Sequence, residues 1–414
     1  MSKVNEKVLL PLADARQHML TAITSVVETQ MVVLDDLLGR ILAEDIVSPL
    51  NSPPADNSAM DGYALSLYDE SDSAFNVVGK AMAGEPFTGV VQQGQAVRIM
   101  TGAEVPAGAD TVVMQENVAR EDDVISLTKP PVKGANIRRA GEDIANGERL
   151  FLAGHRIGPM DIGLLATLGL AEVSVVKPLT VALFASGDEL QAPGQSLGPG
   201  DIYDSNRYFL KAMLNRLGCQ VIDLGVVADD LEQLREAYRA ADEQADAVIT
   251  CGGASVGEAD YAQQLLAELG EVEFWKVAIK PGKPFMFGQL RKSVFFGLPG
   301  NPVSALVTFH QLVLPVLQKM QGQKMQGGQV EQPLSLMARS TQDIRRNRQR
   351  LDFQRGLYKD DGHGGFEVTP DRQQSSGALG PMSRCNCFIL VAAGENALKS
   401  GEPVEILPFD GWLR

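Results

Sequence analysis

The chain has 414 residues, too many for one ordinary hydrophobic core, and this length predicts two to four domains. Hydrophobic residues make up 44% of it and the formal net charge is −15, which is typical of a globular protein and unsuited to nucleic acid or an anionic membrane as main partner. A small anionic ligand remains compatible, because a local lysine cluster can act inside an acidic protein.

Targeting and metal-binding signals are absent from the sequence pattern. The N-terminus lacks the apolar core of a signal peptide, and no run of about eighteen apolar residues occurs. The 4 cysteines include no Cys-x-x-Cys pair and the 4 histidines are scattered, so we expect reduced thiols and no histidine-rich zinc site. The expected location is cytoplasmic.

The first part of the chain changes character along its length. Residues 12–29 have the spacing of an amphipathic helix, and residues 34–47 predict a short helix and a strand. From 51 to 140, short valine-containing runs separated by glycine and proline predict β-structure. Residues 160–176 return to a helix followed by a strand.

Polar turns within and just after the β region could carry chemistry. They contain Asp56, Asp61, Thr101, Arg138 and Asp143. Short polar side chains in such turns often bond only to the local backbone, so each turn taken alone favours a structural interpretation.

The segment from 179 to about 322 is the most regular. Apolar runs at 179–185, 220–227 and 293–298 alternate with helical patterns, and Asp229 or Asp230 can cap one of these helices. Such alternation predicts a doubly wound α/β domain with a parallel sheet covered on both faces.

Glycines follow one of these apolar runs, in the stretch TCGGASVGEADY (250–261). Gly252 and Gly253 would let backbone amides approach a ligand, Ser255 adds a hydroxyl, and the next helix begins after Gly257. An anion site and a plain tight turn are both compatible with this pattern.

Two other strand ends carry polar or glycine turns. Asp188 and Glu189 follow one strand, and Pro299 to Asn301 follow another before a helix with Pro302 in its first turn. Because the carboxyl ends of parallel strands lie at one edge, we expect the three turns together. The two carboxylates could hold Mg²⁺ or simply begin a solvated helix.

A basic segment, KVAIKPGKPFMFG (276–288), contains Lys276, Lys280 and Lys283, with prolines that stiffen it. It could be a solvated loop, but beside three glycine-type strand ends a site for phosphate or another tetrahedral oxyanion is favoured. Beyond a Gln/Gly-rich stretch at 321–329, short strands predict a small barrel or sandwich. The arginines of 344–356 could bind an anion or protect an edge strand.

Nine motifs in this order resemble a known family, the molybdopterin molybdenumtransferases that include MoeA and the gephyrin E domain. They are DNSAMDGYA, RIMTGA, NIRRAGEDI, SGDEL, IYDSN, CGGASVGEADY, KPGKPF, LPGNPVSA and LDFQRG. The resemblance covers essentially the whole chain. Departures such as Cys251, Ala254 and Ser205 remove neither a charge nor a glycine.

The resemblance implies four domains and a homodimer. An elongated linker domain would comprise 1–50 and 141–178, with an inserted β domain at 51–140. The molybdopterin-binding, MogA-like α/β domain would span 179–326, and a C-terminal β barrel 327–414. Each active cleft would combine the α/β domain of one subunit with the inserted domain of the other.

The reaction implied by the resemblance is insertion of molybdate into adenylylated molybdopterin, dependent on Mg²⁺, with release of AMP. Residues that would bind the pterin phosphate and pyrophosphate are Gly252, Gly253, Ser255, Gly257, Pro299 and Asn301, and Asp229 joins this substrate-binding set. Residues that would bind Mg²⁺ are Asp188, Glu189 and Asp260. Molybdate would contact Lys280, Lys283, Ser304, Arg350 and Ser376. Lys276 would neutralise phosphate charge, and the second subunit would contribute Asp61, Thr101, Arg138 and Asp143.

Two other functions compete with the transferase. The single-domain molybdopterin adenylyltransferase shares the α/β domain, but the segments 1–178 and 327–414 argue against it; that enzyme is instead a candidate partner that hands over the substrate. Related domains in animals act as receptor scaffolds, but the intact charged and glycine positions favour an enzyme.

Overall fold

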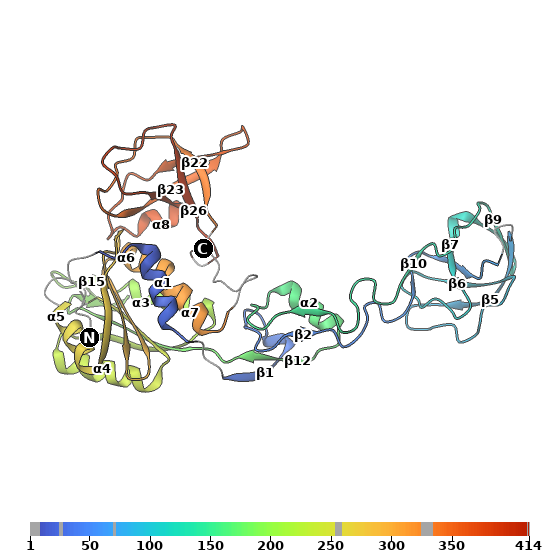
Figure 1. The fold of residues 1–414 in the computed structure, drawn as a ribbon, viewed down its shortest axis with the longest axis horizontal. Coiled ribbons are helices and arrows are strands. Elements are labelled where there is room, and N and C mark those ends of the chain that lie inside the picture. Colours follow the sequence, from blue (N-terminus) through green and yellow to red (C-terminus); the bar gives the residue numbers. More distant parts are fainter. Residues whose placement is uncertain are drawn as a thin grey trace.

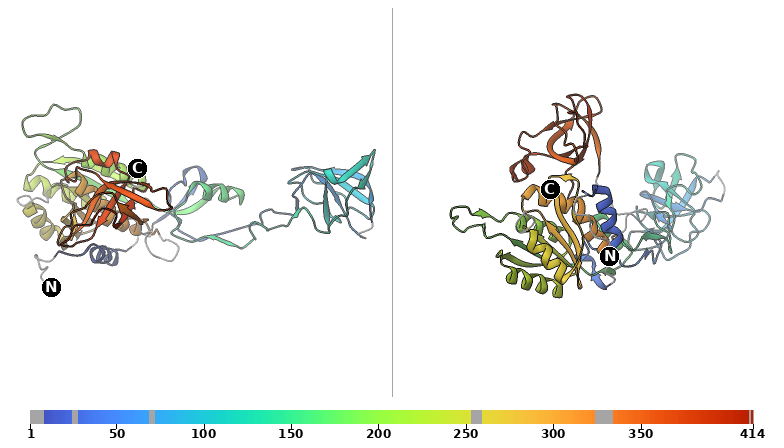
Figure 2. Two further views of the ribbon diagram at one scale, coloured as in Figure 1. Left: turned by 90° about the horizontal axis from the view of Figure 1, so that it is seen from above. Right: turned by 60° about the vertical axis from the view of Figure 1, so that its left-hand side comes forward.

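The computed structural model describes residues 9–24, 28–68, 72–252, 259–323, 334–411 and 413. The molecule is elongated (Figure 1). The α/β domain and the C-terminal strands lie at one end and the inserted sheet lies at the other, with a slender linker between them. The same separation is visible from above and after rotation (Figure 2).

A six-stranded sheet forms the α/β domain. Its order is β16 (Gln220–Val227), β13 (Thr180–Ser186), β17 (Ala247–Cys251), β21 (Val294–Leu298), β20 (Pro284–Leu290) and β18 (Gly270–Lys276). The first four strands are parallel, as predicted. Strand β20 runs antiparallel to both of its neighbours, β21 and β18, so the sheet is mixed. The connection from β18 to β20 is too short for the helical crossover that parallel pairing requires.

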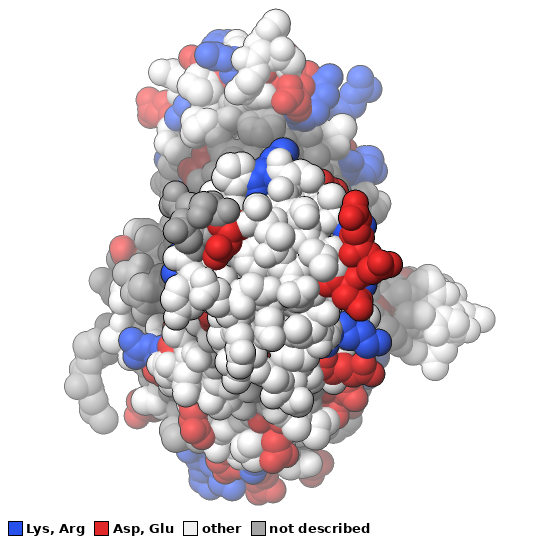
Figure 3. All heavy atoms as spheres, turned by 90° about the vertical axis from the view of Figure 1, so that its right-hand side faces the viewer, with Lys and Arg blue, Asp and Glu red and all other residues white. Residues whose placement is uncertain are grey.

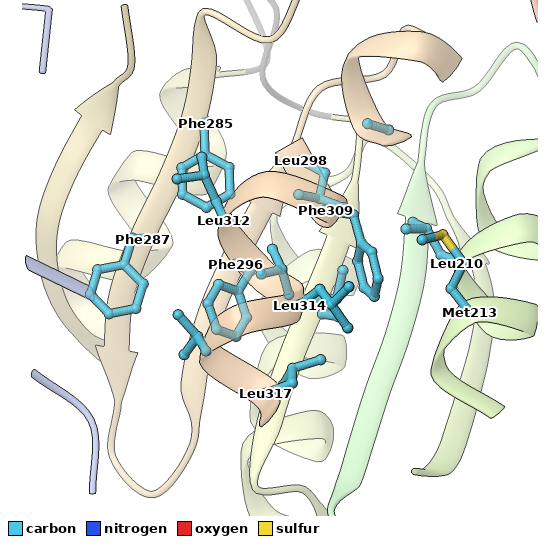
Figure 4. Packing of buried hydrophobic residues seen from close by; sticks show 14 of the residues in the cluster. Leu210, Met213, Phe285, Phe287, Phe296, Leu298, Phe309, Leu312, Leu314 and Leu317 are labelled. Atoms are coloured by element: carbon cyan, nitrogen blue, oxygen red, sulfur yellow. The ribbon is translucent and has the colours of Figure 1, made fainter. Parts of the chain in front are cut away.

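Helices cover both faces of this sheet, which confirms the doubly wound α/β domain. Helices α4 (Leu231–Gln244) and α5 (Ala259–Leu269) pack on one face. The other face holds α3 (Asn206–Leu217) and a continuous run of α6 (Pro302–Thr308), the π-turn η3 (Phe309–Val313) and α7 (Leu314–Met320). Figure 4 shows phenylalanines of the strands packed against leucines of this run.

Helix α1 spans Leu12–Ala22 and ends well before residue 29, where the sequence placed its end. Ile23 is already extended, and a strand, β1 (Thr29–Val33), follows. Ala15, Met19 and Ile23 are buried in the core shared with the α/β domain. The demand for burial of Ile23 therefore outweighs continuation of the helix, which a β-branched residue supports only weakly.

The linker is built from short pieces far apart in sequence. Strand β1 pairs with β12 (Glu172–Val176), and β2 (Ile46–Val47) pairs with β11 (Arg149–Phe151). The expected helix near residue 34 is only a 3₁₀ turn, η1 (Leu34–Asp36), whereas α2 (Pro159–Thr167) forms as predicted. A small core joins these pieces.

The inserted region forms a six-stranded sheet, which confirms its β character. The order is β7 (Thr111–Met114), β4 (Gly62–Leu65), β6 (Gln95–Ile99), β5 (Ala74–Ala81), β9 (Val124–Leu127) and β8 (Val118–Glu121), with η2 (Gln115–Asn117) between β7 and β8. Two further strands, β3 (Asn57–Ser58) and β10 (Ile137–Arg138), pair with each other. Seen from this end, the near face is broadly uncharged with acidic edges (Figure 3).

The C-terminal region is a closed barrel, as expected. Its strands are β22 (Leu336–Ser340), β23 (Leu351–Asp360), β24 (Phe366–Pro370), β25 (Cys387–Val391) and β26 (Pro403–Pro408), and α8 (Gly380–Arg384) precedes β25. Strand β23 pairs with both β24 and β25, which closes the ring. A short strand from the α/β domain, β19 (Ile279–Lys280), adds in parallel to β23.

The described part of the chain bears on two expectations from the sequence, which concern membrane-spanning helices and the state of the cysteines. None of its helices combines the length and apolarity needed to cross a membrane. All 4 cysteines are free and buried, as expected for reduced thiols. Burial raises the pKa of Cys219, Cys251 and Cys387 to about 12.

Candidate active site

The three predicted turns lie together at one edge of the α/β sheet. Strands β13, β17 and β21 are neighbours and parallel, with Ala185 opposite Cys251 and Cys251 opposite Leu298. Their ends open into a cleft of about 680 Å³. Its lining includes Glu189, Gly252, Pro299 and Asn301, each of which was predicted from the sequence, together with the flap formed by β14 (Leu190–Gln191) and β15 (Ile202–Tyr203).

The backbone packs so tightly here that Gly252 is required. Its φ is +104°, and a Cβ at this position would lie 2.2 Å from the carbonyl oxygen of Ser186. Gly300 faces Gly252: a Cβ added to Gly300 would be 3.7 Å from the Gly252 Cα. A side chain is therefore excluded at Gly252, whereas a Cβ at Gly300 would make only ordinary van der Waals contact. Gly253, Ser255 and Gly257 lie outside the described residues.

Asn206, which the sequence did not single out, joins two of these strand ends. It begins α3, it is 8% exposed, and its Nδ2 donates to the Gly300 carbonyl oxygen at 2.6 Å and to the Cys251 Sγ at 3.1 Å. The available signal was its place as the last residue of the motif IYDSN. Its amide fixes the turn after β21 relative to the end of β17.

Two of the predicted Mg²⁺ ligands lie at the end of β13. The Asp229 backbone N–H donates to Asp188 Oδ1 at 3.1 Å. The Glu189 carboxylate lies over Gly187: a Cβ added to Gly187 would be 2.7 Å from Glu189 Oε2. Asp260 begins the next helix, but its side chain is not among those described. The described residues contain no group of three or more metal-ligating side chains; the two carboxylates offer the oxygen donors that Mg²⁺ prefers.

The three lysines do not line the cleft, which reaches their segment at Pro284, the residue that pairs with Lys276. Lys276 ends β18 and Lys283 is exposed just before β20. Lys280, on β19, forms an ion pair with Asp352 of the C-terminal barrel, with 3.0 Å between Nζ and Oδ2. The basic segment is thus attached to the barrel, which the sequence alone did not show.

Ser304 and Ser376, two other residues assigned to molybdate, lie where α6 meets the loop before α8. The Val303 N–H donates to the Ser376 carbonyl oxygen at 3.0 Å, next to Ser304, which is 4% exposed. Arg350 is half-buried at the start of β23. Arg355 is 1% exposed and donates to carbonyl oxygens of the loop that leads to Ser376, so its role is structural.

The four residues assigned to a second subunit belong to the inserted region or follow it directly, and Figure 1 shows the inserted sheet at the opposite end of the molecule from the α/β domain. Asp61 accepts hydrogen bonds from the Thr101 N–H and Oγ1, both at 2.7 Å. These bonds, the backbone one first, lower the pKa of Asp61. Arg138 on β10 and Asp143 are exposed. One chain alone therefore does not bring them to the strand ends.

The fold and the cleft define a class: multidomain proteins with glycine turns at the strand ends of an α/β domain, an inserted β domain and a closed barrel. Comparisons with known proteins name it further. The MoeA N-terminal region model (domains I and II) matches residues 10–169, the probable molybdopterin binding domain 182–319, and the MoeA C-terminal region (domain IV) 337–409.

Relatives agree over the full length. A molybdopterin molybdenumtransferase from Haemophilus influenzae is 45% identical over 407 residues, covering 98% of this chain and all of that protein. One from Nostoc is 35% identical, covering 96% of this chain and 91% of that protein. A solved MoeA protein from Pyrococcus horikosii superposes with a TM-score of 0.82 at 32% identity, covering 98% and 100% of the two chains. The chain belongs to the MoeA family of molybdopterin molybdenumtransferases, and it is a transferase of molybdenum cofactor biosynthesis.

Proposed function

We propose that this enzyme takes adenylylated molybdopterin and molybdate, requires Mg²⁺, and yields molybdenum-loaded molybdopterin and AMP in the cytoplasm. The observation that supports it most is the convergence of three strand-end turns on one cleft, which reaches the lysine segment at Pro284. A substrate with several phosphate oxygens needs closely spaced backbone donors and nearby cations, and this edge of the sheet offers both.

The turns after β17 and β21 would bind the phosphates. Gly252 and Gly300 carry no side chains that would hold a ligand away from the backbone. Asn301, at the start of α6, makes no capping hydrogen bond with its side chain in the structure, so its amide can turn toward the substrate. Lys276 would neutralise charge on the phosphate that is released with AMP.

The carboxylates after β13 would hold Mg²⁺, with Asp260 completing the set. When bound, the ion would reduce the negative charge of the pyrophosphate and so lower the barrier to its cleavage. Glu189 lines the cleft, and Asp188 is fixed by the Asp229 N–H. These two side chains would also orient the water that cleaves the adenylate link.

Molybdate would bind at the seam with the barrel. It is a dianion, so ammonium, guanidinium and hydroxyl groups suit it better than carboxylates do. The residues that we assign to molybdate are Lys280, Lys283, Ser304, Arg350 and Ser376. Lys280 pairs with the barrel strand β23, and Ser304 follows Val303, whose N–H donates to Ser376. The sulfurs that capture molybdenum belong to the substrate, which is consistent with four buried cysteines in the enzyme.

A homodimer would complete the cleft. Asp61, Thr101, Arg138 and Asp143 belong to or adjoin an inserted domain that its own linker holds away from the strand ends (Figures 1 and 2). The Asp61–Thr101 hydrogen bonds already fix that carboxylate in one orientation. A second subunit would therefore supply a preorganised group, and the molybdopterin adenylyltransferase would supply the adenylylated substrate.

The test is turnover with defined substrates. Purified protein is incubated with adenylylated molybdopterin, molybdate and Mg²⁺, and AMP release is measured together with reconstitution of an apo-molybdoenzyme. Asp260→Asn and Lys280→Ala should each reduce both signals by about 100-fold. Lys359→Ala, an exposed lysine of the barrel paired with Glu367, is the control and should keep full activity. Tight binding of the adenylate by wild-type protein without turnover would instead indicate a carrier or scaffold.

A further inference from the structure

A buried carboxylate contacts the lysine assigned to molybdate. Asp352 is 3% exposed, and its Oδ2 accepts from Lys280 Nζ at 3.0 Å and from Gln354 Nε2 at 3.1 Å. The Lys280 side chain remains 44% exposed. A negative charge at an oxyanion site opposes the ligand's own charge, so its presence there needs an explanation.

Holding the two domains together does not explain this pair, because the backbone already does so. Ile279 pairs with Leu351 and Lys280 with Asp352 along β19 and β23, and the Leu351 N–H donates to the Ala278 carbonyl oxygen at 3.0 Å. Because the Lys280 side chain stays 44% exposed, water screens its charge, and ion pairs of this kind usually contribute at most about 1 kcal/mol. The strand pairing already joins the two domains, so the main contribution of the ion pair is to orient the ammonium group.

Orientation is what a lysine in an oxyanion site lacks by itself. Its side chain has four rotatable carbon–carbon bonds, and ordering it on binding reduces affinity. The ammonium has three donors, and Asp352 accepts one of them, which leaves two for a ligand. Gln354 in turn fixes the carboxylate, so the direction of the ammonium is set by a buried, hydrogen-bonded partner from the barrel.

We infer that Asp352 is a positioning residue that holds Lys280 ready for the tetrahedral dianion, so that the C-terminal barrel tunes oxyanion affinity in the α/β domain. This inference rests on the proposed function. Asp352 itself makes no contact with the substrate in this proposal, and it affects the reaction only by orienting Lys280.

The test is a double-mutant cycle on the full-length protein, with initial rates measured over a range of molybdate concentrations. Asp352→Asn should raise the KM for molybdate about tenfold, while kcat and the KM for adenylylated molybdopterin change less than about twofold. In the Lys280→Ala background, adding Asp352→Asn should change the molybdate KM by less than about twofold. Asp360→Asn, at the exposed end of the same strand, is the matched control and should match wild type.

Three results would overturn the inference. An unchanged molybdate KM in Asp352→Asn would remove the positioning role, and a lower KM would make Asp352 a competitor of the dianion. An equally large effect of Asp352→Asn with and without Lys280 would show a general disturbance of the barrel, which the melting temperatures of the variants would also reveal. If wild-type protein shows no molybdate-dependent turnover, the proposed function fails and this inference fails with it; active wild type with an unaffected Asp352→Asn rejects this inference alone.

Discussion

Replacing Asn206 by alanine should disrupt the cleft through a lining residue that is not assigned to the substrate. The change removes the amide that donates to the Gly300 carbonyl oxygen at 2.6 Å and to the Cys251 Sγ at 3.1 Å. Gly300 is exposed, so water can take the place of the lost donor, and a hydrogen bond of this kind contributes about 0.5–1.5 kcal/mol; the thiol contact adds little. We therefore expect the free energy of unfolding to fall by about 1 kcal/mol.

Activity should fall by more than this loss of stability explains, since the folded fraction stays high. The turn that carries Gly300 and Asn301 would move, and a shift of about 1 Å in a positioning group can reduce turnover about 100-fold. The assays are urea unfolding and kcat/KM for AMP release. Asn215→Ala, an exposed asparagine of the same helix, is the control. Equal kcat/KM values for the two variants would refute the argument that Asn206 holds the turn.

Three further predictions follow from the site. Gly252→Ala should abolish activity and destabilise the chain by at least about 1–3 kcal/mol, because φ is +104° and the new Cβ would collide with the Ser186 carbonyl oxygen. A variant with a normal kcat and a normal unfolding midpoint would contradict this account of how the backbone packs at Gly252. Cys251, with its pKa raised to about 12 by burial, should resist iodoacetamide at pH 8 in native protein and react once unfolded, as read by mass spectrometry; rapid native labelling would contradict its burial. The lowered pKa of Asp61 stabilises the folded state above about pH 4, and this stabilisation is lost as the pH falls through the folded-state pKa. Thr101→Val removes one of the hydrogen bonds that lower this pKa, so the variant should unfold at a higher pH than wild type in an acid titration. Coincident unfolding curves would exclude this linkage.

Local pattern was enough to predict much of the α/β domain. The apolar run 220–227 became β16 and the amphipathic stretch from Leu231 to Gln244 became α4, because side-chain periodicity and burial agree there. The convergence of three strand ends was also predictable, since parallel neighbours end at one edge. These predictions concern what each segment does by itself or what sheet topology dictates.

Contacts between distant segments could not be predicted in this way. Asn206 meets Gly300 across 94 residues, and Lys280 meets Asp352 across 72. Neither pair has a periodicity or spacing that a single sequence displays, because the first depends on packing within the α/β domain and the second on how that domain docks with the barrel. The shortened α1 has the same origin: Ile23 leaves the helix to fill a core formed with residues from 179 onward.

The most direct test of the account is a mixed-subunit experiment, because the central claim is one cleft assembled from two chains. Asp61→Asn alters the inserted domain and Glu189→Gln alters the strand-end turns, and each homodimer alone should be nearly inactive. Co-expressed chains that assort randomly give half heterodimers, each with one intact cleft of two, so AMP release should recover to about one quarter of the wild-type rate. Recovery to that level supports the shared cleft. A mixture as inactive as the separate variants would contradict it and confine the active site to residues of a single chain.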